Sequence, residues 1–362
     1  MINVTKAFLP SVEAYNEYVK GIWERGQLTN HGPLVVELEG KLKSYLGVKH
    51  FLFVANGTIA LQLAIKALDL RGEIITTSFS YVATTSSIVW ENAHPVFVDI
   101  DPETLTIDSD KIVAAITDKT SAILATHVYG IPCDVEAIDM IARKHRLKVI
   151  YDAAHSFGVR YNDQSVLNYG DISTLSFHAT KLFHTVEGGG VATNDDDLAH
   201  RLSYLRNFGH NGQEKFWGLG INGKNSEFHA AMGLCVLPHV ADILAKRRKL
   251  SELYDLTFME NGIRLRRPKV SSLTNYNYAY FPVVFENEDM LIGVRDQLNK
   301  NDIFPRRYFY PSLNTLPFIT HPGQCQVAES IASRVLCLPL HHDLSEEEVH
   351  FIVSKIAEYM TK

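Results

Sequence analysis

Long apolar runs and an excess of positive charge are both missing from this sequence of 362 residues. No stretch approaches the ~20 apolar residues of a membrane-spanning helix. Near the amino terminus, Lys6, Glu13, Glu17 and Lys20 put charge where a signal peptide would have its apolar centre. The formal net charge is -6, which excludes a general attraction to nucleic acid or to anionic membranes. We therefore expect a cytoplasmic protein that binds anionic ligands only at a local site.

Paired cysteines are missing as well. The four cysteines contain no C-x-x-C pair and are Cys133, Cys235, Cys325 and Cys337. This scatter argues against a disulfide framework or a zinc site and favours reduced thiols. The run His341-His342-Asp343 has no further His or Cys ligand nearby, so a loop is favoured there and no metal site is predicted.

What is present, between residues 50 and 195, is an alternation of short apolar runs with helical patterns. The predicted strands are residues 51–54, 73–77, 95–100, 121–126, 148–151, 173–177 and 190–193. Between them, stripes such as Leu61, Ala64, Ile65 and Leu68 follow the spacing of amphipathic helices. The alternation predicts an α/β fold with a mostly parallel, buried sheet, whose ligands bind beyond the carboxyl ends of the strands.

The pattern changes in the carboxyl-terminal third. Residues 226–256 predict a long helix interrupted near Pro238, residues 276–285 are aromatic and β-branched, and residues 290–299 look helical. Ser345 and Glu348 form a capping box for a last helix. We predict a large domain at residues 1–240, with the amino-terminal segment, and a smaller α/β domain at residues 241–362.

A lysine downstream of a strand-end aspartate carries the main chemical signal. Asp152 follows the strand at 148–151, and Lys181 lies further along the chain. A pyridoxal phosphate (PLP) enzyme needs a lysine amine to condense with the cofactor aldehyde and a carboxylate to keep the pyridine nitrogen protonated. Each residue alone has an ordinary interpretation, Lys181 as surface charge and Asp152 as a helix N-cap.

A phosphate site is the second signal. Asn56-Gly57-Thr58 ends one strand and opens a helix, where free N–H groups and the helix dipole favour an anion. The alternative is a simple helix start. Ser176 could add a hydroxyl to the same phosphate, and alone it would be an ordinary strand serine.

Three side chains are suited to the cofactor ring. Tyr81 follows the strand at 73–77 and could stack on the ring, although Phe79 competes for that role and core packing is the alternative. His155 could reach the phenolate oxygen, or it could be a structural histidine. Ala153 and Ala154, directly after Asp152, would leave room for a flat ring.

Together these motifs resemble the DegT/DnrJ/EryC1/StrS family of PLP-dependent nucleotide-sugar aminotransferases. The resemblance is carried, in order along the chain, by Asn56-Gly57-Thr58, Asp152-Ala153-Ala154-His155, Ser176-Phe177-His178-Ala179-Thr180-Lys181 and Glu187-Gly188-Gly189. It extends from Gln27 to Leu340 and covers nearly the whole chain. It implies the aspartate aminotransferase-like (type I) fold, pyridoxal 5'-phosphate as cofactor, and a homodimer with shared active sites.

The resemblance also implies roles for single residues. Lys181 is expected to form the Schiff base and Asp152 to hold the pyridine nitrogen, while Tyr81 matches the stacking aromatic. The phosphate ligands it implies are Ser176, Gly57, Thr58 and, from the neighbouring subunit, Asn222. His155 stands where many members have Gln, and Lys224 stands where members more often have Arg.

Within the family, residues 176–190 and 304–311 look closest to enzymes that aminate dTDP-4-keto-6-deoxyglucose at C4. Arg306 and Arg307 could bind the pyrophosphate, and rings such as Tyr308 the sugar or base. The alternative is a surface loop whose aromatics pack on the small domain. We expect transfer of an amino group from L-glutamate to a dTDP-4-keto-6-deoxyhexose, giving a dTDP-4-amino-4,6-dideoxy sugar for a surface polysaccharide or a natural-product glycan.

Three other functions compete with this expectation. The enzyme could aminate a dTDP-3-keto-6-deoxyhexose at C3. Sugar dehydratases of this fold carry His in place of the Schiff-base lysine, and Lys181 argues against them. A non-catalytic scaffold or sensor would need a DNA-binding module, for which the acidic chain offers no spare amino-terminal segment.

Overall fold

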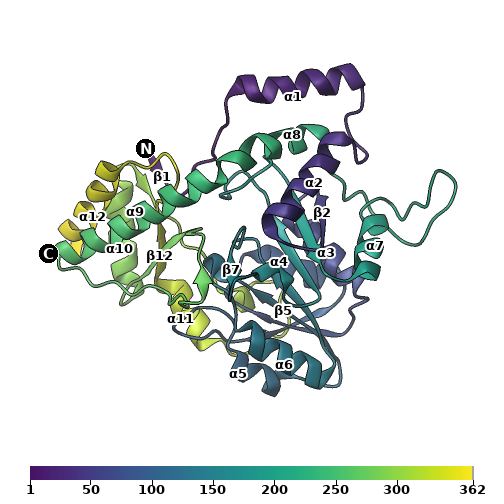
Figure 1. Ribbon diagram of the computed structural model, residues 1–362. Coiled ribbons are helices and arrows are strands. Elements are labelled where there is room, and N and C mark those ends of the chain that lie inside the picture. The colour runs from purple at the N-terminus through teal and green to yellow at the C-terminus, as the bar shows by residue number, and fades with distance from the viewer. Residues whose placement is uncertain (361–362) are drawn as a thin grey trace.

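The computed structural model describes residues 1–360 and places a seven-stranded sheet at the centre of the larger part of the molecule (Figure 1). Its strands, in the spatial order β2-β10-β9-β6-β5-β3-β4, are β2 (His50–Val54), β10 (Gly189–Thr193), β9 (Ile172–Ser176), β6 (Lys148–Asp152), β5 (Thr120–Thr126), β3 (Glu73–Thr77) and β4 (His94–Val98). Neighbouring strands are parallel except at β10, which runs antiparallel to both β2 and β9. All seven predicted strands are therefore present, and the α/β fold is confirmed.

Helices cover both faces of this sheet. Successive residues of each strand point to opposite faces, so apolar side chains on both faces pack against helices. Ile74, Leu124 and Ile150 pack in one cluster with α3 (Gly57–Ala67), α4 (Val82–Trp90) and α7 (Asp196–Leu205). Their chain neighbours Ile75, Ile123 and Val149 pack on the other face with α5 (Ser109–Ile112) and α6 (Val135–His145). The helix α2 (Pro33–Leu46) packs against β2 and α8 (Glu227–Val236).

The carboxyl-terminal part has its own core around Tyr254, Phe281, Leu291 and Val353. Its elements are α9 (Val240–Glu260), β12 (Phe281–Val284), α10 (Glu288–Asn299), β13 (Ile303–Phe304), α11 (Gln326–Arg334), β14 (Val335–Leu338) and α12 (Glu346–Met360). The predicted capping box is confirmed, since Ser345 N donates to Glu348 Oε2 at 2.9 Å and Glu348 N to Ser345 Oγ at 3.1 Å. The strand β1 (Ile2–Asn3) pairs with β13, so the amino terminus lies against this part. We propose the division near residue 240 on the basis of this separate core.

The predicted long helix is interrupted at Pro238, where the 3₁₀ turn η4 (Leu237–His239) joins α8 to α9. By length and composition alone, the stretch Glu227–Glu260 is apolar enough to cross a membrane, contrary to the expectation that no stretch approaches that length. Of its most apolar window, 44% is buried inside the chain, and buried core helices satisfy the same criterion.

Two segments extend from this body (Figure 1). The helix α1 (Val12–Arg25) lies along α8. After α7, residues 206–223 form an arm that projects into solvent, closed by antiparallel bridges between Asn207 and Asn222 and between His210 and Phe216. The remaining short elements are η1 (Val113–Ala115), η2 (Val128–Gly130), β7 (Arg160–Tyr161), β8 (Gln164–Ser165), η3 (Val166–Asn168), β11 (Thr274–Asn275) and η5 (Leu313–Thr315).

Candidate active site

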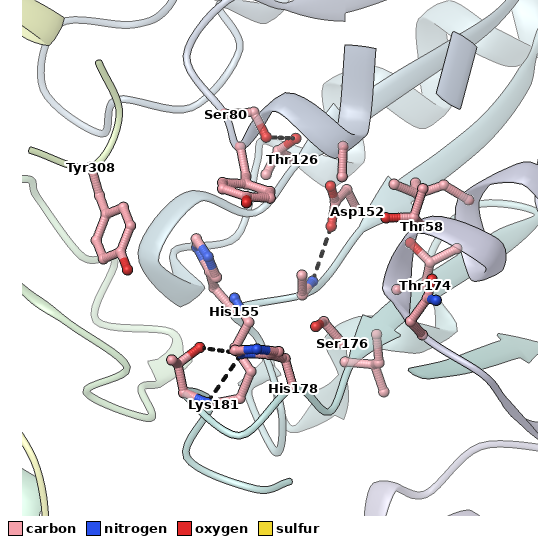
Figure 2. A pocket seen from close by; sticks show the side chains of 18 of the residues that line it. Thr58, Ser80, Thr126, Asp152, His155, Thr174, Ser176, His178, Lys181 and Tyr308 are labelled. Atoms are coloured by element: carbon pink, nitrogen blue, oxygen red, sulfur yellow. Dashed lines mark hydrogen bonds between the residues drawn. The ribbon is translucent and has the colours of Figure 1, made fainter. Parts of the chain in front are cut away.

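A cavity of about 470 Å³ lies at the carboxyl ends of the parallel strands, where the sequence predicts a ligand site (Figure 2). Thr126, Asp152 and Ser176 reach it as the last residues of β5, β6 and β9. The other wall comes from the carboxyl-terminal part of the chain. Of the residues predicted for the site, those that line this cavity are Gly57, Thr58, Tyr81, Asp152, His155, Ser176, Lys181, Arg306 and Tyr308. Asn222 and Arg307 do not line it.

Lys181 lies in the loop that joins β9 to β10. A cluster of aromatic rings fixes this loop, with Phe183 stacked on Phe157 at 4.5 Å and edge-on to Phe177 at 4.9 Å between ring centroids. Burial lowers the pKa of the Lys181 amine to about 8, although the Asp152 carboxylate acts in the opposite direction. A neutral amine is the nucleophile toward an aldehyde, so this depression prepares Lys181 for Schiff-base chemistry.

Asp152 is 5% exposed, and its carboxylate accepts two hydrogen bonds. Ala154 N donates to Oδ1 at 3.1 Å, and Thr84 Oγ1 donates to Oδ2 at 2.7 Å. No helix begins after Asp152, because residues 153–158 form turns, so the helix-cap interpretation is wrong. Burial raises the pKa of this carboxyl, while Thr84, Ala154 and Lys181 favour its ionised form. A cationic ligand group would supply the missing counter-charge.

His155 is held in one tautomer. Tyr129 N donates to its Nδ1 at 3.1 Å, which leaves the ring proton on Nε2. Burial, followed by the charge of Lys181, holds the pKa of His155 well below its usual range, so the ring is neutral. A neutral imidazole with Nε2–H can donate a hydrogen bond, as a glutamine amide does. The geometry is therefore compatible with the contact that the resemblance implies at this position, and this role of His155 stays a proposal.

The other end of the cavity is suited to an anion. The Asn56 side chain caps α3 by accepting from Ile59 N at 2.9 Å. The first N–H groups of the helix, on Gly57 and Thr58, have no intrahelical acceptor and belong to cavity residues. Glycine is needed at position 57, because a Cβ there would come within 2.9 Å of the Ser176 Cβ. The serine hydroxyl therefore lies close to the helix start.

The structure separates the two aromatic candidates for ring stacking. Tyr81 lines the cavity and is 57% exposed. Phe79 is fully buried and packs edge-on against Tyr129 and Phe309. Phe79 therefore belongs to the core, and the stacking role stays a proposal for Tyr81.

The two neighbouring arginines have different surroundings. Arg306 lines the cavity beside Tyr308, and its guanidinium carbon lies 5.3 Å from that ring centroid. Arg307 points away from the cavity, where it pairs with Glu288 at 2.6 Å and donates to Ser333 O at 2.8 Å. The expectation that Arg307 binds substrate is therefore not supported, because its charge is already neutralised outside the cavity.

Asn222 lies at the base of the arm, outside the cavity. Its Oδ1 accepts from Lys224 Nζ at 2.8 Å, so the amide N–H groups remain available to another acceptor. The cavity is also lined by residues that received no role from the sequence, among them Ser80, Thr126, Thr174, His178, Glu187, Tyr280 and Phe309. Thr126 could have been found by the strand-end rule that identified Asp152.

The groups that line the cavity fit pyridoxal phosphate bound in a single orientation. The anion site at Gly57 and Ser176 is suited to the phosphate, the buried carboxylate of Asp152 to the pyridinium, and the amine of Lys181 to the aldehyde. The model of the DegT/DnrJ/EryC1/StrS aminotransferase family matches residues 11–357. The chain belongs to this family and is a PLP-dependent aminotransferase.

Its similarity to individual enzymes extends over the whole chain. It is 44% identical to a dTDP-4-amino-4,6-dideoxy-D-glucose transaminase from Shigella dysenteriae, over 99% of this chain and 98% of that enzyme. An enzyme of the same name from Escherichia coli is 41% identical, with the same coverage. The crystal structure of DesI with its TDP-sugar product superposes with a TM-score of 0.93 at 30% identity, covering 100% of this chain and 93% of DesI. These matches confirm the predicted family and fold.

Proposed function

We propose that this enzyme transfers an amino group from L-glutamate to C4 of a dTDP-4-keto-6-deoxyhexose, giving a dTDP-4-amino-4,6-dideoxy sugar. The observation that carries the proposal is that Lys181, Asp152 and Arg306 line one cavity, and that Arg306 has no ion-pair partner among residues 1–360. The names of the two transaminases at 44% and 41% identity support the sugar and the position of amination. We further propose that the product serves a surface polysaccharide such as an O-antigen.

When bound, pyridoxal phosphate supplies an electron sink for the carbon that loses its proton. In our proposal, Asp152 keeps the pyridine nitrogen protonated, His155 Nε2–H donates to the phenolate oxygen, and Tyr81 covers one face of the ring. The Lys181 amine, once free, moves the proton at the substrate carbon as general base and then as general acid. The glutamate and the keto sugar use the same cavity in turn, as a ping-pong reaction requires.

The test is a panel of nucleotide-linked keto sugars offered with L-glutamate, with the products identified by NMR. We expect amination of the dTDP-4-keto-6-deoxy sugar at C4. Exclusive amination of 3-keto sugars would contradict the C4 assignment and favour the C3 alternative. A cofactor-loaded protein that aminated no sugar would favour a scaffold or sensor.

Arg306→Ala is expected to weaken use of the nucleotide sugar selectively. Pyrophosphate is anionic and the chain is acidic, so a local cation must bind it. Loss of one charge-assisted hydrogen bond costs about 1.5–3 kcal/mol, or roughly tenfold or more in kcat/KM for the sugar. The glutamate half-reaction, followed by absorbance in single turnovers, should change little. Arg295→Ala, at an exposed pair with Asp296 on α10, is the matched control. Equal losses in both half-reactions would show that Arg306 is structural.

We also propose a homodimer in which each cavity is completed by the other subunit. The arm exposes a group of apolar side chains that a partner could cover, which are Phe208, Phe216, Trp217, Leu219 and Ile221. Asn222, at the base of this arm, has amide hydrogens available but does not line the cavity of its own chain. If the Asn222 amide donated to the cofactor phosphate in the partner's cavity, this contact would account for both its available hydrogens and its position outside the cavity of its own chain.

Mixing inactive Lys181→Ala and Asn222→Ala chains should partly restore activity. If Asn222 acts across the interface, one site of each mixed dimer combines the intact Lys181 of one chain with the intact Asn222 of the other. Random exchange of subunits would then return about a quarter of the wild-type rate. Subunit exchange is verified with differently tagged chains. Verified mixed dimers that stayed inactive would show that Asn222 acts within its own chain.

We propose a cytoplasmic location as well. All four cysteines are buried free thiols, as expected in a reducing compartment.

A further inference from the structure

Three buried hydroxyl groups form a chain that ends on the Asp152 carboxylate. Thr126 Oγ1 donates to Ser80 Oγ at 3.0 Å, Ser80 Oγ lies 2.7 Å from Thr84 Oγ1, and Thr84 Oγ1 donates to Asp152 Oδ2 at 2.7 Å. Figure 2 shows the link between Ser80 and Thr126 above the carboxylate. The three hydroxyl residues are at most 3% exposed.

The hydrogen bonds of this chain can run in only one direction while Asp152 is ionised. A hydroxyl group has one hydrogen to donate, and Thr84 gives its hydrogen to the carboxylate. Ser80 must therefore donate to Thr84, and Thr126 to Ser80. Hydrogen bonds aligned in this way polarise one another, so each hydroxyl strengthens the last bond to the carboxylate.

The fold explains why these residues meet. Thr126 and Asp152 are register partners at the ends of the neighbouring parallel strands β5 and β6. Ser80 precedes α4 and Thr84 lies in its first turn, and the 2.7 Å hydrogen bond between their hydroxyl groups joins the two. The first turn of α4 therefore lies beside Asp152, where the positive end of the helix dipole also favours a negative charge.

We propose that Thr84, supported by Ser80 and Thr126, is a positioning residue that keeps Asp152 ionised and oriented toward the pyridine nitrogen of the bound cofactor. This support is needed because burial alone disfavours the ionised form of Asp152. Desolvation raises the pKa of Asp152, and the Thr84 hydroxyl is the foremost influence that lowers it. Without this donor, a proton shared between the carboxylate and the pyridine nitrogen would move toward the carboxylate. The proposal rests on the cofactor-binding part of the proposed function and is independent of the sugar.

The experiment titrates cofactor-free protein with pyridoxal phosphate labelled with ¹⁵N in the ring, without any sugar. Thr84→Val keeps the shape and removes the hydroxyl. We expect its affinity for the cofactor to fall about tenfold, the effect of one charge-assisted hydrogen bond. The ¹⁵N resonance should move toward the unprotonated position, and this change should begin at a lower pH than in the wild type. Thr84→Ser should restore both properties, and Ser80→Ala should give a smaller change in the same direction.

The neighbouring Thr85 provides a matched control. It lies on the same helix, is fully buried, and its hydroxyl has no hydrogen-bond partner among residues 1–360. Thr85→Val should therefore leave the affinity and the ¹⁵N resonance unchanged. Equal effects of Thr84→Val and Thr85→Val, or a wild-type resonance in Thr84→Val, would overturn the proposal. Because no sugar is present, an incorrect sugar assignment would not alter these results.

Discussion

Lys181→Ala is expected to lower kcat by on the order of 10⁴-fold or more, because one side chain supplies both the Schiff-base amine and the acid–base group. Borohydride reduction of the wild-type enzyme, followed by peptide mapping, should place the pyridoxyl group on Lys181. The rate of cofactor capture by the free protein should also depend on pH in a defined way. The amine is protonated and unreactive below its pKa of about 8, so capture should accelerate as the pH rises and level off above that value.

The control for this prediction is Lys355→Ala, at a surface ion pair with Glu358 on α12. It should keep wild-type turnover and leave the borohydride label on Lys181. A label on another lysine would contradict the assignment. If the rate of cofactor binding continued to rise up to pH 10, the Lys181 amine would be an ordinary, solvated amine rather than a buried one.

The central sheet could be predicted from the sequence because buried parallel strands are short apolar runs bounded by turns. The direction of β10 could not, since a run such as Gly190-Val191-Ala192 has the same pattern in either orientation. The pairing of Ile2 with Ile303 was also beyond prediction, because two-residue strands carry no periodicity. The arm at residues 206–223 has no strand or helix pattern, and its form depends on a few bridges.

Some site residues could be predicted because a place at a strand end or a helix start is enough to put them at the cavity. Asp152 and Ser176 end parallel strands, and Gly57 opens a helix, so their placement follows from the fold. Arg306 and Arg307 differ because adjacent residues of an extended segment point to opposite sides. Which of them faces the cavity is set by the bridge between Arg306 and Cys337, a contact far apart in sequence.

Asp152→Asn is expected to reduce kcat by on the order of a hundredfold or more while the protein stays folded. Asparagine has almost the same shape, and its side-chain oxygen can still accept from Ala154 N or Thr84 Oγ1. The negative charge opposite the pyridinium is lost, however, and an electrostatic contact that strengthens in the transition state is worth about that factor. The measurements are turnover, cofactor affinity, and thermal unfolding of the cofactor-free protein.

The same substitution separates a structural role of Asp152 from a chemical one. Asparagine stabilises turns about as well as aspartate, so a purely structural Asp152 would tolerate the change with near-normal turnover. Burial already raises the pKa of this carboxyl, and removing its charge relieves the desolvation cost in the empty cavity. The cofactor-free variant should therefore unfold at the wild-type temperature or above it. Asp139→Asn, at an exposed pair with Arg143 on α6, should change neither quantity. A variant that lost activity only because it unfolded at a lower temperature would contradict the chemical role.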